Sequence, residues 1–335
     1  MAPSATEQSE VTYEDLIQLE QEFEDADLQI IRQQYKITQP LYKKRQDLIA
    51  KLPNFWALVF EQAPPELDQY IQPSDSEIFA ECLKSLEVTR FEIDDPSGSP
   101  RSFSIKFGFS PNEYFENEVL EKKFWHRRAL DGWSGLVSEP VKINWKKGKD
   151  TTDGLTDAAA ALFEARQKLS EKEQKSQLTK LPEYKALTKK LELSEEGTLS
   201  FFTLFGFISV RPFVSAEESA KATKKEAEER AKGSKAEKSE EDNEDDELIQ
   251  LFEESEIFPS GDELATLIAE DLWPNAIKYF TSAQEADDED LSSIEDVEDW
   301  GSDEGEPVDI RSLVKGKGKK EKNGESSPPA KKRRT

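Results

Sequence analysis

The chain has 335 residues, of which 35% are hydrophobic and 35% are charged, and its formal net charge at pH 7 is −26. Globular chains are about 45–50% apolar and about 25% charged, so we expect part of this chain to remain unfolded. The negative charge argues against specific nucleic-acid binding. The single cysteine and single histidine exclude an internal disulfide and a cysteine-ligated zinc site, and leave little scope for histidine catalysis.

The charge is concentrated near the C-terminus. Residues 240–310 contain 27 acidic residues and one basic residue, so their net charge equals that of the whole chain. The last 25 residues contain ten Lys or Arg and two Glu. Segregated blocks of charge are typical of interaction segments, although a merely solubilising tail is the alternative. We predict a disordered N-terminus over residues 1–12 and a disordered acidic tail over 283–335 that ends in a basic segment.

Residues 13–52 have the pattern of a long helix. Apolar residues recur every seven positions, with a companion position at Leu19, which is typical of a coiled-coil seam. The seam residues are Leu16, Leu19, Phe23, Ile30 and Ile37. Pro40 interrupts the pattern, which therefore fits either two helices or one kinked helix. We predict that this segment pairs two copies of the chain; the alternative is an amphipathic helix packed only on its own core.

Residues 53–282 have the patterns of a mixed helical and sheet lobe. Ser74–Cys82 reads as a helix with Ser74 as its N-cap and Glu77 completing a capping box. Apolar residues alternate in Leu86–Ile93 and in Phe103–Phe109, and turn-forming residues join the two, which indicates an antiparallel hairpin. Further strands are expected at Val119–Trp125 and Val141–Trp145.

The second half of this lobe is less regular. Residues 156–193 are helix-prone, and residues 199–210 are apolar enough to be buried. Residues 215–247 are rich in Lys, Glu and Ala, and they indicate either disorder or a solvated helix. Helices are expected over Gly261–Leu272 and from Pro274 to Phe280, where the proline suits a first helical turn.

The sequence contains none of the motifs that carry common catalytic chemistry. It has no glycine-rich phosphate loop followed by a helix, no nucleophile elbow and no EF-hand spacing. His126 is expected at the surface near a strand end, and Cys82 is expected to be a small buried hydrophobic residue. We therefore predict no enzyme activity, no cofactor and no metal. The first ten residues lack the features of a signal peptide, and the most apolar stretch, 201–210, is too short to span a bilayer. These features favour a soluble intracellular protein without membrane contact.

Six motifs, in order along the chain, resemble the nucleosome assembly protein (NAP) family, and closely its SET branch. They lie at residues 39–56, 107–117, 143–146, 148–150, 200–203 and 270–280. The resemblance covers most of residues 13–282. Glu113 stands where the family commonly has proline, and the stretches 156–193 and 215–250 look like insertions of the kind found in fungal members.

The resemblance implies an α+β fold in which a long, kinked dimerisation helix carries a lobe of antiparallel sheet packed with helices. It also implies an ATP-independent histone chaperone that binds core histones through the underside of the lobe. The matching residues are Asp262, Glu263, Glu270 and Asp271 in the lobe, with Asp287, Asp288, Glu289 and Asp290 in the tail. An N-cap role is the alternative for Asp262. Trp56, Trp145 and Trp273 are expected to hold the lobe together. A different reading is a docking cofactor for a histone acetyltransferase, or a phosphatase inhibitor.

The C-terminal basic run resembles a nuclear import signal. Two prolines and an alanine precede four consecutive basic residues, Lys331, Lys332, Arg333 and Arg334. A short extended basic segment suits an importin groove, whereas a non-specific basic tail is the alternative. The resemblance thus predicts a nuclear protein that can also shuttle through the cytoplasm.

Overall fold

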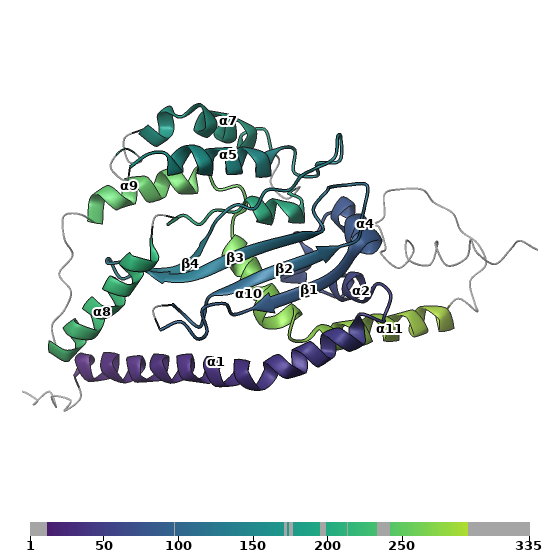
Figure 1. Ribbon diagram of the computed structural model, residues 1–335, viewed down its shortest axis with the longest axis horizontal. Helices are drawn as coiled ribbons and strands as arrows, with labels where there is room; N and C mark the ends of the chain where they lie inside the picture. The colour runs from purple at the N-terminus through teal and green to yellow at the C-terminus, as the bar shows by residue number, and fades with distance from the viewer. Residues whose placement is uncertain are drawn as a thin grey trace, which may run out of the picture.

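The computed structural model describes residues 12–293, apart from residues 97, 171–172, 174–176, 195–198, 213 and 233–241. One long helix, α1 (Tyr13–Ile49), runs along one edge of the molecule, and a lobe of sheet and helices lies beside it (Figure 1). This arrangement confirms the predicted α+β fold. No helix within the described residues combines the length and the apolar composition that a membrane crossing needs.

Helix α1 begins at a capping box and continues past its internal proline. The Asp15 amide donates to the Thr12 hydroxyl over 3.2 Å, and the Thr12 amide donates to the Asp15 carboxylate over 2.8 Å. Pro40 lies inside the helix, so the segment is one helix and not two. The helix bends in its second half (Figure 1), as expected where a proline removes a backbone hydrogen bond. It ends at Ile49, before the predicted end at residue 52.

The sheet is a four-stranded antiparallel meander with strand order β1-β2-β3-β4. Its strands are β1 (Leu83–Thr89), β2 (Phe103–Phe109), β3 (Val119–Arg128) and β4 (Ser134–Ser138). The predicted hairpin is confirmed as β1 and β2, and the predicted strand from Val119 is confirmed as β3. One face of the sheet is buried and the other carries polar side chains. In β2, for example, Ile105 and Phe107 are buried and Lys106 is exposed, because successive side chains point to opposite faces.

The predicted strand Val141–Trp145 is wrong. The Val141 amide donates to the Phe205 carbonyl over 2.7 Å, outside the sheet, and Trp145 forms only an isolated bridge with Phe115. The fourth strand is β4, which follows a turn at Gly132 with φ of 92°, a conformation that favours glycine. The sequence Ser-Gly-Leu-Val-Ser of β4 has too little apolar alternation to be predicted as a strand.

Three short helices connect α1 to the sheet: α2 (Phe55–Glu61), α3 (Pro65–Asp68) and α4 (Pro73–Cys82). The predicted capping box of Ser74 and Glu77 is wrong. Gln72 is the N-cap of α4 and Asp75 completes the box, with the Gln72 amide 3.0 Å from the Asp75 carboxylate. The physical reason is Pro73, which occupies the first helical position and so starts the helix earlier.

The hydrophobic core lies between the sheet and η2 (Phe201–Gly206), a 3₁₀ segment whose six residues are all buried. Aromatic rings dominate it: the ring centroids of Phe60 and Phe79 are 4.6 Å apart, and those of Phe79 and Phe201 are 5.2 Å apart. The structure therefore confirms that this part of the apolar stretch 199–210 is buried. It likewise confirms a packing role for Trp56 and Trp273, which are 3% and 7% exposed.

The helix-prone stretch 156–193 forms α5 (Leu155–Gln167), η1 (Leu178–Lys180) and α7 (Pro182–Leu191). Leu162, Leu178 and Leu187 from these elements are buried in the core. This segment is therefore an integral part of the lobe, and α5 and α7 lie at the edge of the lobe opposite α1 (Figure 1).

The last part of the lobe is mainly helical, with short turns between the helices. The Lys- and Glu-rich stretch contains α8 (Ala216–Lys232) and α9 (Asp242–Glu253), so disorder is the wrong alternative for these residues. Helix α10 (Gly261–Leu267) continues into a π-helical segment, η3 (Ile268–Leu272), and α11 (Ala276–Ser293) follows. The predicted start of the tail at residue 283 lies inside α11, where Ala283 is fully buried.

Candidate functional site

The outer face of α1 is apolar and exposed. All five residues of the predicted seam have between 49% and 67% of their surface exposed, and Leu41, Leu48 and Leu52 add further exposed apolar surface. Soluble proteins rarely leave a long apolar stripe uncovered, and such stripes mark interfaces. The structure therefore places the sequence-predicted seam together on one accessible surface, which we call the α1 seam: Leu16, Leu19, Phe23, Ile30 and Ile37.

The inner face of α1 holds the lobe through polar contacts. The Glu24 carboxylate accepts hydrogen bonds from Arg101 and Arg128, over 2.9 and 3.0 Å. Further along, the Arg45 guanidinium donates to the Trp273 carbonyl over 2.6 Å and lies 4.7 Å from the centroid of the Trp273 ring. Packing of α1 on its own lobe thus accounts for the residues on the inner face of the helix, but it does not account for the exposed apolar residues on the outer face.

The four predicted lobe carboxylates lie on two consecutive segments. Asp262 and Glu263 are in the first turn of α10, and Glu270 and Asp271 are in η3. Glu263 and Glu270 are exposed, whereas Asp262 and Asp271 are half-buried. An N-cap role for Asp262 is wrong, because the N-cap of α10 is Ser260, which makes no side-chain capping bond.

Two of these four carboxylates have partners within the lobe. Glu270 forms an ion pair with Arg90 over 3.1 Å. Asp271 accepts hydrogen bonds from the Asn275 amide group and the Tyr279 hydroxyl, each over 2.7 Å. A cationic ligand must compete with these partners at η3, so Asp262 and Glu263 are the more available pair.

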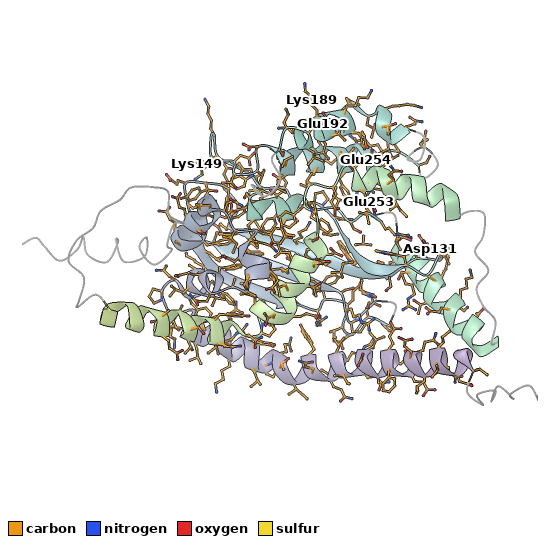
Figure 2. All side chains as sticks on the ribbon, turned by 180° about the vertical axis from the view of Figure 1, so that it is seen from behind. Asp131, Lys149, Lys189, Glu192, Glu253 and Glu254 are labelled. Atoms are coloured by element: carbon orange, nitrogen blue, oxygen red, sulfur yellow. The ribbon has the colours of Figure 1, made fainter. Side chains whose placement is uncertain are left out.

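Sequence reasoning missed Glu256, which lies between α9 and α10. Burial, together with the negative charges of Asp262 and Glu253, raises the pKa of Glu256 to about 7. We call Glu253, Glu256 and Asp262 the acidic patch. Glu253 and its neighbour Glu254 lie at the end of α9 (Figure 2). A signal was present in the sequence, because Glu256 directly precedes Ile257 and Phe258, which are 2% and 0% exposed.

The acidic patch predicts that the free energy of unfolding depends on pH, and that one substitution should remove this dependence. The folded-state pKa of Glu256 is raised, so its favourable contribution is present below the unfolded pKa, near 4.5, and is lost as pH rises through about 7. We expect Glu256→Gln to raise the free energy of unfolding at pH 8 by about 1 kcal/mol, a value reduced for partial solvation. Below pH 4.5 this gain should disappear. Urea denaturation at pH 4, 6 and 8 measures it.

The matched control is Glu263→Gln, which removes the same charge from an exposed side chain of α10. It should change the unfolding free energy by less than about 0.5 kcal/mol at each pH. Equal changes in unfolding free energy for the two substitutions would show that the charge of Glu256 does not destabilise the folded state.

The remaining predicted site residues cannot be placed in the same way. The predicted tail carboxylates lie within α11, but their side chains are outside the described part of the structure: Asp287, Asp288, Glu289 and Asp290. The four basic residues of the predicted import signal, 331–334, also lie outside the described residues.

His126 lies two residues before the end of β3, so its expected position near a strand end is confirmed, whereas its side chain is half-buried and not fully at the surface. Burial, with the positive charges of Arg101 and Arg128, lowers the pKa of His126 to about 4. The imidazole is therefore neutral near pH 7. It lies 3.3 Å from the Ser134 hydroxyl on the neighbouring strand, so its contacts are structural.

Two other reactive groups are engaged inside the lobe. The Lys122 ammonium, in β3, is fully buried and donates to the carbonyls of Glu139, Phe205 and Phe207 over 2.8, 3.3 and 2.9 Å. Burial lowers the pKa of Lys122 well below its usual value. The Cys82 thiol donates to the Ile78 carbonyl over 3.0 Å, which confirms the expected buried, structural cysteine. Within the described residues no three His, Cys, Asp or Glu side chains are grouped as metal ligands.

Comparison with known proteins identifies the family. A Schizosaccharomyces pombe protein named for nucleosome assembly is 29% identical over 293 residues, which are 84% of each chain. The Drosophila melanogaster protein SET is 32% identical over 44% of this chain and 52% of its own. The solved structure of Ccp1 is 27% identical and covers 81% of this chain and 95% of its own, with a TM-score of 0.49. The family model described as nucleosome assembly protein (NAP) matches residues 49–283. The chain therefore belongs to the nucleosome assembly protein family.

Proposed function

We propose that the protein is a histone chaperone that promotes nucleosome assembly without ATP. Family membership supports a role in nucleosome assembly. The observation that carries the more specific proposal is the carboxylate surface of α9 and α10. There burial, together with the negative charges of Asp262 and Glu253, raises the pKa of Glu256 to about 7. A basic ligand relieves this repulsion, so the surface is suited to lysine and arginine side chains.

The physical mechanism is competition for the positive charge of histones. Core histones are basic and bind DNA phosphates without selectivity, and carboxylates compete with the phosphates for the same side chains. The long-range field of the acidic segment, residues 240–310, speeds encounter and depends on salt. The chaperone need only weaken non-specific contacts so that the nucleosome remains as the most stable product.

The direct test is a plasmid supercoiling assay with purified core histones, relaxed DNA and the full chain in the absence of ATP. We expect supercoils to accumulate at a salt concentration at which histones alone precipitate the DNA. Polyglutamate of similar net charge is the control, because it reproduces the charge without the lobe. The proposal is rejected if the chain produces no more supercoils than polyglutamate does.

The exposed α1 seam supports a second part of the proposal, that the working form is a homodimer. Five large apolar side chains on one helix face can be covered by the same face of a second copy. The two lobes then carry two acidic patches, which suits a histone pair better than a single patch does.

We further propose that importin carries the protein into the nucleus through residues 331–334. A fluorescent fusion that lacks residues 328–335 should shift from the nucleus to the cytoplasm, because the four consecutive basic residues are then absent. Replacing Lys319, Lys320 and Lys322 by Gln is the control, since it removes basic residues from a different cluster. Nuclear accumulation of the deletion variant, equal to that of the full chain, contradicts this proposal.

A further inference from the structure

The polar face of the sheet carries a cavity between β3 and the stretch that follows β4, which we call the sheet cavity. It has a volume of about 180 Å³. Pockets for drug-sized ligands have volumes of roughly 300–1,000 Å³, so the sheet cavity has room for one side chain and not for a larger ligand. Its lining residues are Glu121, Lys123, Trp125, Glu139, Pro140 and Val141.

The alternation of β3 places the sheet cavity on the face of the sheet that points away from the core. Leu120 and Phe124 are buried in the core, whereas Glu121 and Lys123 are exposed, because successive side chains point to opposite faces. Helix α10 packs on the buried face, where its Leu264 belongs to the core. The sheet cavity and the acidic patch are therefore separate surfaces of the lobe.

Both carboxylates of the sheet cavity are available to a ligand. The side chains of Glu121 and Glu139 are exposed, and neither forms an ion pair or a hydrogen bond with the described residues. Lys106 faces Glu121 in the register of β2 and β3, yet no ion pair joins the two. The main chain at Glu139 is held in place, because its carbonyl accepts a hydrogen bond from the buried Lys122 ammonium over 2.8 Å.

The one lysine in the lining turns its charge away from Glu139. The Lys123 ammonium lies 5.4 Å from the centroid of the Phe91 ring. Phe91 follows β1 and Glu139 follows β4, and these two strands are the opposite edges of the sheet. The ammonium is thus attracted to an aromatic ring on the far side, and the stem of Lys123 contributes methylene surface to the cavity.

Trp125 forms a wall of the sheet cavity and lies outside the core. Its side chain is half-buried, and the hydrophobic clusters formed by the described residues do not include it. The Phe91 ring meets the indole edge-on, with the ring centroids 5.9 Å apart and the planes at 79°. Core packing therefore does not account for this indole, and an indole beside unpaired carboxylates is suited to a cation.

Arginine is the cation that fits these groups best. Its guanidinium is planar, stacks on aromatic rings and donates to carboxylates through a rigid fork, whereas the lysine ammonium is a compact and strongly hydrated charge. The methylenes of an arginine side chain match the apolar surface that Pro140, Val141 and the stem of Lys123 provide.

We propose that the sheet cavity binds an arginine side chain from a basic protein partner. The guanidinium lies against Trp125 and donates to the carboxylates of Glu121 and Glu139. The inference rests on the proposed function only for the source of the arginine, since core histones are basic. It does not involve the acidic patch.

The test uses Nα-acetyl-arginine-N-methylamide as the probe, with the full chain labelled with ¹⁵N on its indole groups for NMR. The spectrum of Trp125→Leu lacks one indole signal, which assigns the signal of Trp125. We expect a saturable shift of this signal with the arginine probe and none with the corresponding citrulline probe, which has a similar shape without the charge. Glu121→Gln and Glu139→Gln should each weaken probe binding about fivefold, because each removes one exposed ion pair.

Matched variants separate the cavity from the general charge of the lobe. Glu118→Gln removes an exposed carboxylate directly before β3 and outside the cavity lining, so probe affinity should stay unchanged. Lys123→Gln should strengthen probe binding about twofold, because it removes a nearby like charge. All of these side chains are exposed, so the melting temperature should change little. The proposal is overturned by equal shifts with the citrulline probe, by tighter binding of the corresponding lysine probe, or by an affinity that Glu121→Gln and Glu139→Gln leave unchanged.

The two proposals fail separately. If the arginine probe does not bind while the chain still assembles nucleosomes, the cavity assignment is wrong and the proposed function stands. If the probe binds but the chain assembles no nucleosomes, the arginine site is real and the histone proposal is wrong.

Discussion

A chain carrying Phe23→Asp and Ile30→Asp is expected to sediment as a monomer of 38.1 kDa, whereas the unaltered chain at micromolar concentration sediments at about twice that mass. The two side chains are 65% and 57% exposed in the single chain, so the substitutions cost the isolated lobe little. In the dimer they place four unpaired charges in a closed seam. At about 1.5–3 kcal/mol for each lost apolar side chain, dissociation should increase by more than about 10⁴-fold.

The control for this experiment adds the same charge elsewhere on the helix. Gln18 and Gln29 are exposed residues of α1 that lie away from the α1 seam. Gln18→Asp with Gln29→Asp should leave the sedimenting mass unchanged. An unaltered chain that sediments at 38.1 kDa, or a control that dissociates as readily as the seam variant, contradicts dimerisation through this face.

Reversing the two available lobe charges, with Asp262→Lys and Glu263→Lys, is expected to weaken core-histone binding roughly thirtyfold at physiological salt. Each exposed ion pair that is lost costs up to about 1 kcal/mol, and the new positive charges repel the ligand. Fluorescence titration with each histone pair across a salt series measures the change. Glu164→Lys with Glu192→Lys reverses two exposed charges, one on α5 and one at the C-cap of α7, and this control should retain most of the affinity.

Two shortened chains separate the tail from the lobe in the same titration. Residues 294–310 carry eight acidic residues and no basic one, and residues 311–335 carry ten basic residues and two acidic ones. A chain ending at residue 310 should therefore bind histones more tightly than the full chain. A chain ending at 293, which preserves all of α11, should bind about tenfold more weakly than the 310 chain at low salt, with a shallower salt dependence. Loss of all binding in the 293 chain, with normal binding in the lobe variant, places the site in the tail.

Sequence patterns predicted the parts of the fold in which one periodic signal dominates. The heptad of Leu16, Phe23 and Ile30 indicated an exposed seam, and the alternation from Phe103 to Phe109 indicated β2, because both patterns follow the geometry of a single element. The strand at Val141–Trp145 failed, since its apolar residues pack against η2 and the loop at Phe115, and no neighbouring strand pairs with them. Long-range packing of this kind leaves no local periodicity.

The candidate site was predictable only in part. The positions of Asp262, Glu263, Glu270 and Asp271 came from family resemblance, and the structure adds that the last two are held by Arg90 and Tyr279. Glu256 was hidden among more than twenty acidic residues of one segment. Its raised pKa depends first on burial and then on the charges of Asp262, in α10, and Glu253, and composition contains no record of these contacts.

The burial of Lys122 makes this amine a built-in reporter of lobe opening. Acylating reagents modify lysines that are accessible and unprotonated, and the fully enclosed Lys122 side chain, bonded to three carbonyls, is out of reach while β3 stays joined to the segment after η2. The modification rate of Lys122 can be compared by mass spectrometry with that of the exposed Lys123. The ratio of the two rates therefore reports how often the lobe opens locally. This measurement needs no added label and no engineered residue, and it can be made while a basic partner is present.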